Sequence, residues 1–247
     1  MKLLIDFGNS RCKWALLDNE GLSPSGIIDY QQQARSNRKQ YVIERLPINQ
    51  ANQIDCVSVL GEVFDQAFTS TMRDEFSSSA YFHYSQVDNY GIRLAYADPS
   101  SYGSDRYACL IAVAREPGAK IIVDVGTAVT IDAMDADNVH LGGLIFSGSD
   151  LMSRALSARA TGIEEIGDPQ KVEYLNNTTA QSVYSGGLLS QAHAIHSIVN
   201  TIKASLFTPV KIFITGGGAD NVVRYVDHDY LCRPNLVLEG LQLMQRG

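Results

Sequence analysis

Short apolar runs that stop at a polar turn recur along this chain, and amphipathic stretches separate them. The sharpest example is residues 120–132, KIIVDVGTAVTID, where an apolar run stops at Asp124-x-Gly126-Thr127 and then resumes. This pattern predicts two strands joined by a tight turn. Gly126 supplies a residue that tolerates a positive φ, and Thr127 places a hydroxyl beside backbone N–H groups that can meet a phosphate. An ordinary hairpin with a capping aspartate would leave the same pattern.

A second copy of the pattern stands at the N-terminus. The apolar residues 3–5 run into residues 6–10, DFGNS, which predicts a hairpin with strands at 2–7 and 11–18. Repetition at domain scale predicts a duplicated fold, with domains at 1–117 and 118–247. Two acidic, glycine-containing hairpins that face each other would bind a nucleoside triphosphate from both sides.

The rest of the hydrophobic pattern alternates between strand and helix periodicity. Such alternation predicts an α/β fold with mixed sheets flanked by helices. Strands are expected at 54–59, 81–84, 139–145 and 210–214, and helices at 31–45, 62–76, 104 onward, 150–160, 179–205 and 236–245.

Composition narrows the possible functions. A chain of 247 residues with 45% hydrophobic and 19% charged residues has an ordinary globular composition, and its length fits two domains of about 120 residues. The net charge of −7 argues against a nucleic-acid surface, which needs clustered lysine and arginine. The short basic stretch at 35–39 is interpreted as a solvated helix face.

Cysteine spacing and hydropathy indicate a compartment. Cys12, Cys56, Cys109 and Cys232 show no C-x-x-C spacing, and three of them lie in apolar runs, where a free thiol packs as a small hydrophobic group. The chain begins directly with a strand, and no apolar run approaches the length of a membrane span. A reduced, cytoplasmic location without membrane partners is therefore expected.

The stretch 89–106 carries a second group of candidate residues. Pro99 and Gly103 mark a loop, and the sequence becomes helical from Ser104, so Asp105 falls in a first helical turn. An aspartate there is favoured by the free N–H groups and the helix dipole, without any catalytic role. The position alone therefore leaves the role of Asp105 open.

Taken together, several motifs give the chain a resemblance to a known family. The two hairpins resemble those of the superfamily that contains acetate kinase, sugar kinases, heat-shock chaperones and actin. Within it, the chain resembles the type III pantothenate kinases over nearly its whole length. The matching segments are 6–13, 103–106, 124–130, 142–148, 179–186 and 215–217.

This resemblance implies a fold and a reaction. The fold would be two duplicated ribonuclease H-like domains of the actin-like ATPase type. The reaction would be the ATP-dependent phosphorylation of pantothenate to 4'-phosphopantothenate, the first step of coenzyme A biosynthesis. ATP with Mg²⁺, a monovalent cation (K⁺ or NH₄⁺), and a homodimer whose interface completes the substrate pocket are implied in the same way.

The resemblance also implies roles for individual residues. Asp105 would be the general base, Arg106 would hold the substrate, and Asp124 would be the protein ligand of the monovalent cation. The substrate-binding residues would be Tyr96, Gly103, Ser104, Asp105, Arg106 and Thr179. The ATP-binding residues would be Asp6, Phe7, Gly8, Asn9, Ser10, Arg11, Cys12, Lys13 and Thr127.

The second half departs from the family pattern at two positions. Ser147 stands where the family has a proline, which removes a fixed φ from that loop, and Thr178 stands where it has an asparagine. The glycines at 216–218 would lie beside the adenosine, by analogy with the superfamily.

Two pairs of residues in the predicted helix at 179–205 have simpler explanations than a chemical role. Gly186 and Gly187 are attributed to close helix packing, since glycine costs stability in a helix. His193 and His196 are interpreted as core or interface residues, because no carboxylate or cysteine partner completes a metal site.

Two alternative functions remain open from the sequence. One is a kinase of the same superfamily that acts on another small alcohol. The other is a non-catalytic regulator, since some family members were described as accessory factors for gene expression. The presence of Asp6, Asp105 and Asp124 argues against an inactive protein.

Overall fold

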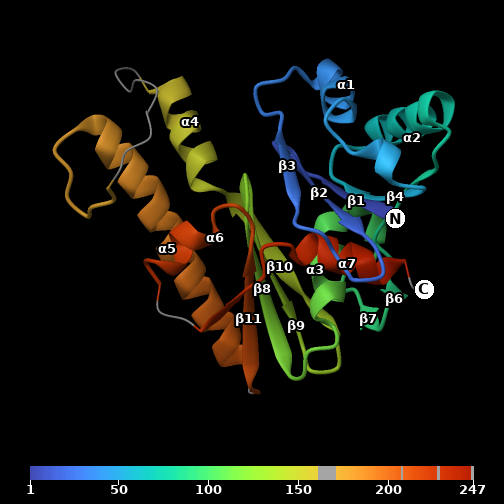
Figure 1. The fold of residues 1–247 in the computed structure, drawn as a ribbon. Helices are drawn as coiled ribbons and strands as arrows, with labels where there is room; N and C mark the ends of the chain where they lie inside the picture. Colours follow the sequence, from blue (N-terminus) through green and yellow to red (C-terminus); the bar gives the residue numbers. More distant parts are fainter. Residues whose placement is uncertain (161–170, 207, 227–228, 246–247) are drawn as a thin grey trace. The chain divides into compact units, whose positions relative to one another are not determined.

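The computed structural model describes residues 1–160, 171–206, 208–226 and 229–245. The chain forms two compact units (Figure 1). Unit 1 comprises Met1–Glu116 together with Asn235–Gly247, and unit 2 comprises Pro117–Pro234. The division at 1–117 and 118–247 expected from the repeat therefore differs at the C-terminal segment, which groups with unit 1.

Helix α7, Leu236–Met244, accounts for this difference. It packs against helix α3, Ser104–Val113, and against the first strand of unit 1. The two helices approach so closely that a Cβ on Gly240 would overlap the carbonyl group of Ala108. A linear halving of the chain cannot anticipate a terminal helix that returns to the first half.

Five strands form the sheet of unit 1, in the order β3-β2-β1-β4-β5. The central strand β1 pairs antiparallel with β2 and parallel with β4, while β3 is antiparallel to β2 and β5 is parallel to β4. The strands are Lys2–Phe7 (β1), Arg11–Leu17 (β2), Gly26–Asp29 (β3), Gln53–Ser58 (β4) and Ala80–Phe82 (β5).

Helices cover both faces of this sheet (Figure 1). On one face, Leu3, Ile5 and Phe7 pack against α1 and α2 in a core that also holds Phe68 and Met72. Helices α3 and α7 contact β4 and β1. The remaining elements of the unit are α1 (Arg38–Ile43), α2 (Glu62–Phe76), the hairpin of β6 (Asp88–Asn89) and β7 (Ile92–Arg93), and the 3-10 turns Arg35–Asn37, Ile48–Gln50 and Pro99–Ser101.

Unit 2 repeats the topology of unit 1. Its sheet has the order β10-β9-β8-β11-β12. Strand β9 is antiparallel to both β8 and β10, β11 is parallel to β8, and β12 is parallel to β11. The same order and the same strand directions confirm the predicted duplication. The strands are Ala119–Val125 (β8), Ala128–Met134 (β9), His140–Ser147 (β10), Val210–Thr215 (β11) and Tyr230–Cys232 (β12).

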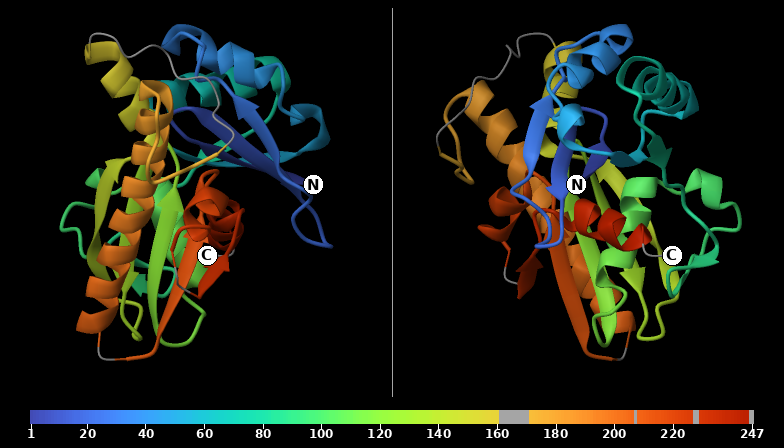
Figure 2. Two further views of the ribbon diagram at one scale, coloured as in Figure 1. Left: turned by 90° about the vertical axis from the view of Figure 1, so that its left-hand side faces the viewer. Right: turned by 45° about the vertical axis from the view of Figure 1, so that its right-hand side comes forward.

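The long helix α5, Thr179–Ser205, lies along one face of the unit 2 sheet (Figure 2). Its residues Ala192, Ile195 and Val199 are fully buried against Ile121 and Val123 of β8. Two more helices complete the unit, α4 (Ser149–Arg159) and α6 (Ala219–Val223).

The expected elements agree well with these bounds, with one shortened helix and five short strands or helices missed. The helix expected at 31–45 is reduced to a 3-10 turn and the six residues of α1, and neither Ala34 nor Asn37 makes a side-chain cap there. Strands β3, β6, β7 and β12 and helix α6 span only two to five residues each, too few to produce a periodic signal. Within the described ranges, no helix is long and apolar enough to cross a membrane.

Candidate active site

The β1–β2 hairpin brings two of the predicted nucleotide-binding residues face to face. Asp6 and Lys13 are direct cross-strand partners, and both are half-buried. The side chains of Phe7 and Cys12 are fully buried in the core of unit 1, so a nucleotide could meet these two residues only through their backbone. Burial, with a smaller effect of Asp6, raises the pKa of the Cys12 thiol and keeps it neutral.

The turn of this hairpin is held by two residues from outside it. The Tyr30 hydroxyl donates to the carbonyl oxygen of Gly8, and Arg38 Nη1 donates to that of Asn9 at 2.9 Å. Burial, followed by the proximity of Cys12 and Asp6, raises the pKa of Tyr30, so its phenol stays protonated and able to donate.

Sequence reasoning missed both of these residues. Arg38 lies in the stretch 35–39, whose interpretation as a solvated helix face is wrong for Arg38 and for Lys39, since Lys39 Nζ donates to Thr71 Oγ1 at 2.8 Å. No local pattern could have found these contacts, because each joins residues about thirty positions apart.

The start of α3 is fixed to the end of β4 by one serine. Ser104 Oγ accepts from the backbone N–H of Ser58 at 3.0 Å and donates to the Ser58 carbonyl oxygen at 2.9 Å. Ser58 is the partner of Phe7 in the parallel β1–β4 register, so the first turn of α3 begins beside β1, the strand that leads into the β1–β2 turn. The hydroxyl of Ser104 is engaged by β4, which leaves its backbone as the part able to contact a substrate.

Asp105 and Arg106 follow Ser104 in the first turn of α3. Asp105 Oδ1 accepts from the backbone N–H of Arg106 at 2.7 Å and lies close over Gly103, where a Cβ would come within 2.6 Å of it. The glycine therefore makes room for the carboxylate.

Aromatic rings surround Arg106. Its guanidinium carbon lies 4.4 Å from the ring centroid of Tyr102, and the Tyr102 ring packs edge-to-face with that of Tyr96 at 4.8 Å. Arg106 is 7% exposed. Tyr102, which sequence reasoning did not single out, thus links Tyr96 to Arg106, the residue after Asp105.

In unit 2, the β8–β9 turn lies at the predicted position. Gly126 donates its N–H to the Ala128 carbonyl oxygen at 3.0 Å and is not among the described residues with positive φ, so the turn does not use the tolerance of glycine for that region. A Cβ on Gly126 would lie 3.3 Å from the Ala128 carbonyl oxygen, a tight contact. The closer approach is at Gly148, where a Cβ would come within 2.5 Å of the Gly126 carbonyl oxygen; the Gly148 N–H donates to Thr127 O at 2.9 Å.

The glycine turn after β11 packs onto the same hairpin. Thr215 is the parallel partner of Asp124, and a Cβ on Gly216 would overlap both Asp124 Oδ1 and the Val125 carbonyl oxygen. Gly216 has φ +90, and Gly218 N–H donates to Val125 O at 2.9 Å. The β8–β9 turn and the glycine turn therefore pack directly against each other through their backbones.

A pocket of about 690 Å³ opens between α4 and α5, and Thr179 lies in its wall. Thr178 caps α5, because its hydroxyl accepts from Gln181 N at 3.3 Å. A Cβ on Gly187 would meet Ser153 Oγ at 3.1 Å, which supports close packing for this glycine. The same explanation fails for Gly186, whose Cβ would meet nothing within 4 Å.

The two histidines of α5 contact neighbouring side chains. His193 is exposed and pairs with the Tyr174 hydroxyl at 3.0 Å, so it is not a core residue, while His196 pairs with Asn200 at 3.1 Å. Within the described ranges, no group of three or more histidine, cysteine or acidic residues is arranged to hold a metal ion. Cys12, Cys56 and Cys109 are buried and lie outside any disulfide, as expected.

Two units with one strand order, each with an Asp-x-Gly turn after its central strand, define the duplicated fold of the actin-like superfamily of kinases. Solved structures agree. A putative 2-dehydro-3-deoxygalactonokinase from Sinorhizobium meliloti superposes with a TM-score of 0.63 at 12% identity, covering 100% of this chain and 96% of that one. A putative Baf family transcriptional activator from Campylobacter jejuni gives 0.59 at 18% identity, covering 99% and 98%.

Sequence comparisons define the family within this superfamily. The profile described as type III pantothenate kinase matches residues 2–201. Type III pantothenate kinases from Nitrosococcus oceani and Halorhodospira halophila are 30% and 32% identical to this chain; the alignments cover 98% of it and 92% and 96% of those proteins. The chain belongs to the type III pantothenate kinase family.

Proposed function

We propose that this protein transfers the γ-phosphoryl group of ATP to the primary hydroxyl of pantothenate and releases 4'-phosphopantothenate. Membership of the family supports this reaction. The structural observation that supports it best is the pair of hydrogen bonds between Ser104 and Ser58. They hold the helical turn that carries Asp105 beside the end of β1, where the β1–β2 turn begins.

The two acidic turns suit the nucleotide and its cations. Phosphoryl transfer needs little covalent chemistry from the protein, which helps mainly by positioning and by stabilising charge. Gly8, Asn9, Ser10 and Thr127 would supply N–H and O–H donors to the phosphates. Mg²⁺ and K⁺ prefer oxygen ligands. The Asp124 carboxylate and the Val125 carbonyl oxygen both pack against Gly216, and these two oxygen donors fit such a cation. Asp6 would face the Mg²⁺ that accompanies ATP.

Asp105 and Arg106 would act on the acceptor. Asp105 would orient the attacking hydroxyl and accept its proton as the bond to phosphorus forms. Arg106 would bind the pantothenate carboxylate with two parallel N–H donors. Tyr96 and Thr179 would complete the acceptor site.

We further infer a homodimer built on unit 2. Strand β10 is an edge of its sheet, and its Leu144 and Ile145 are exposed, as are Leu151 and Leu156 of the adjoining α4. An apolar edge strand is a surface that natural proteins cover or pair.

A substrate panel tests the function as a whole. Purified protein is supplied with ATP, Mg²⁺ and K⁺ and with pantothenate, pantetheine or a series of sugars and small alcohols, and phosphate transfer is followed with labelled ATP. Pantothenate should be the preferred acceptor. Preference for another alcohol would favour a kinase with a different acceptor. Transfer to no acceptor would favour a non-catalytic regulator.

The Arg106→Lys variant tests the identity of the acceptor. Arg106 stacks on Tyr102 and presents a planar fork, which lysine cannot reproduce. The Michaelis constant for pantothenate should rise roughly tenfold, while that for ATP stays within about twofold, as expected when a contact with one substrate is lost. Pantetheine lacks the free carboxylate, so it should be a poor substrate and lose less. Equal losses for the two acceptors would show that Arg106 does not bind the carboxylate.

The Asp6→Asn and Asp124→Asn variants separate the two cation sites. Loss of the Asp124 carboxylate should weaken the dependence on K⁺, whereas loss of Asp6 should raise the Mg²⁺ concentration needed for half-maximal activity. The measurement is the initial rate over a series of K⁺ and Mg²⁺ concentrations for wild type and both variants. Unchanged titrations in both variants would contradict the assignment of the paired turns to cations.

A further inference from the structure

Three consecutive carbonyl oxygens of the β1–β2 turn, those of Gly8, Asn9 and Ser10, accept hydrogen bonds from just two residues outside the hairpin. Tyr30 binds two of them, through its hydroxyl to Gly8 and through its backbone N–H to Ser10 at 3.0 Å. Arg38 binds the one between them. These three hydrogen bonds from Tyr30 and Arg38 hold the turn, an arrangement that we call the grip.

This grip determines where the N–H groups of the turn point. In a planar trans peptide the carbonyl and the N–H of the next residue point in opposite directions. The hydrogen bonds to the carbonyl groups of Gly8, Asn9 and Ser10 therefore also fix the orientation of the N–H groups of the three following residues. Backbone N–H groups of a turn can form a concave site for an anion.

Arg38 is held in place by more than its bond to Asn9. Its guanidinium carbon lies 5.3 Å from the ring centroid of Tyr30, an arrangement in which a planar cation is attracted to the ring face. Its Nε is buried and has no hydrogen-bond partner among the described residues. The side chain thus carries a fixed positive charge at the phosphate turn.

We propose that Arg38, seated on Tyr30, is a positioning residue that keeps the β1–β2 turn in its phosphate-binding conformation and adds a positive charge beside the triphosphate. The proposal deepens the proposed function and rests on it, since it assumes that this turn binds ATP. It assigns a role to residues outside the motif at 6–13. If Arg38 only stabilised the fold of unit 1, its loss would lower the affinity of that unit for every ligand equally.

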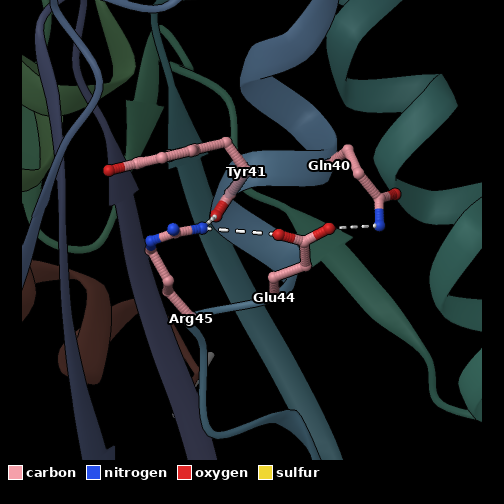
Figure 3. Close-up of polar contacts among 4 residues, drawn as sticks. All are labelled: Gln40, Tyr41, Glu44 and Arg45. Atoms are coloured by element: carbon pink, nitrogen blue, oxygen red, sulfur yellow. Dashed lines mark hydrogen bonds and ion pairs between the residues drawn. The ribbon is translucent and has the colours of Figure 1, made fainter.

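Three variants of the full-length protein test this role. Arg38→Ala removes the charge and the grip, and Arg38→Lys keeps the charge but loses the planar stacking donor. Arg45→Ala is the matched control, because Arg45 lies just after α1 and its side chain bonds to the Tyr41 carbonyl oxygen and to Glu44 (Figure 3). Affinities for Mg²⁺-ATP and for adenosine, which lacks phosphates, are measured by calorimetry, together with Michaelis constants for ATP and pantothenate.

Arg38→Ala should weaken Mg²⁺-ATP binding about tenfold, in line with the loss of one charge-assisted contact. Affinity for adenosine and the Michaelis constant for pantothenate should stay within about twofold. Arg38→Lys should lose about threefold for ATP alone, and Arg45→Ala should match wild type.

Other outcomes overturn the proposal. Equal losses for ATP and adenosine would make Arg38 a structural brace, and unchanged ATP binding in both Arg38 variants would remove any role. If Arg38→Ala does not fold, Arg38→Lys decides, and wild-type ATP affinity in that variant counts against the grip. A selective loss of ATP affinity in a protein that fails to phosphorylate pantothenate would uphold the inference while refuting the proposed acceptor.

Discussion

Replacing Asp105 by asparagine should reduce pantothenate phosphorylation by about 10²- to 10⁴-fold, the usual effect of removing a general base. Asparagine keeps the size of the side chain and can still accept the N–H of Arg106, which Asp105 Oδ1 binds at 2.7 Å, so the first turn of α3 should persist. Only proton acceptance and the orientation of the attacking hydroxyl are lost. The measurement is kcat with saturating ATP and pantothenate, together with ATP affinity, which should not change.

Asp98→Asn provides the matched control. Asp98 also precedes a helical turn, and it accepts from Ser100 N at 2.9 Å and from the Ser100 hydroxyl at 2.7 Å, contacts that asparagine can retain. This variant should keep wild-type activity. If Asp105→Asn retains activity within a few-fold of wild type, Asp105 is a helix-capping residue, which its position in the sequence equally allowed.

The elements that the sequence predicted best are those whose signal is local. The strands of both hairpins combine a buried apolar run with a polar turn, and their burial explains the pattern, since Leu3, Ile5, Ile121 and Val123 are fully buried. The agreement in strand order between the two units follows from the duplication, which the repeated Asp-x-Gly turn indicates. The start of α3 at Ser104 also has a local signal, a loop rich in small residues followed by an apolar helix.

The contacts that complete the candidate site have no such signal. Ser58 and Ser104 bond through a backbone and a hydroxyl 46 positions apart, and Tyr30 reaches back 22 positions to Gly8. Backbone acceptors can be met by many residue types, so nothing in the sequence marks which side chain will meet them. Gly148, where a Cβ would come within 2.5 Å of the Gly126 carbonyl oxygen, shows the converse, because a glycine required for close approach looks the same in sequence as one required for positive φ.

Replacing Gly216 by alanine should abolish most activity, because two effects act at once. The new Cβ would overlap the Asp124 carboxylate and the Val125 carbonyl oxygen, and alanine rarely adopts φ +90. Strain of this kind typically costs about 1–3 kcal/mol. Relief of the overlap requires Asp124 or the glycine turn to move, which should reduce kcat/KM at least about 10²-fold, since an error near 1 Å in a reacting site costs that much.

The Gly142→Ala variant separates the two effects. Gly142 also has a positive φ, +119, but a Cβ there would meet nothing within 4 Å, so this variant carries the backbone strain without the contact with Asp124. Both variants should unfold at lower denaturant concentration than wild type, yet only Gly216→Ala should lose catalytic efficiency and K⁺ dependence together. Comparable activity in the two variants would mean that the contact between Gly216 and Asp124 has no part in catalysis, and that the acidic turn of unit 2 tolerates displacement.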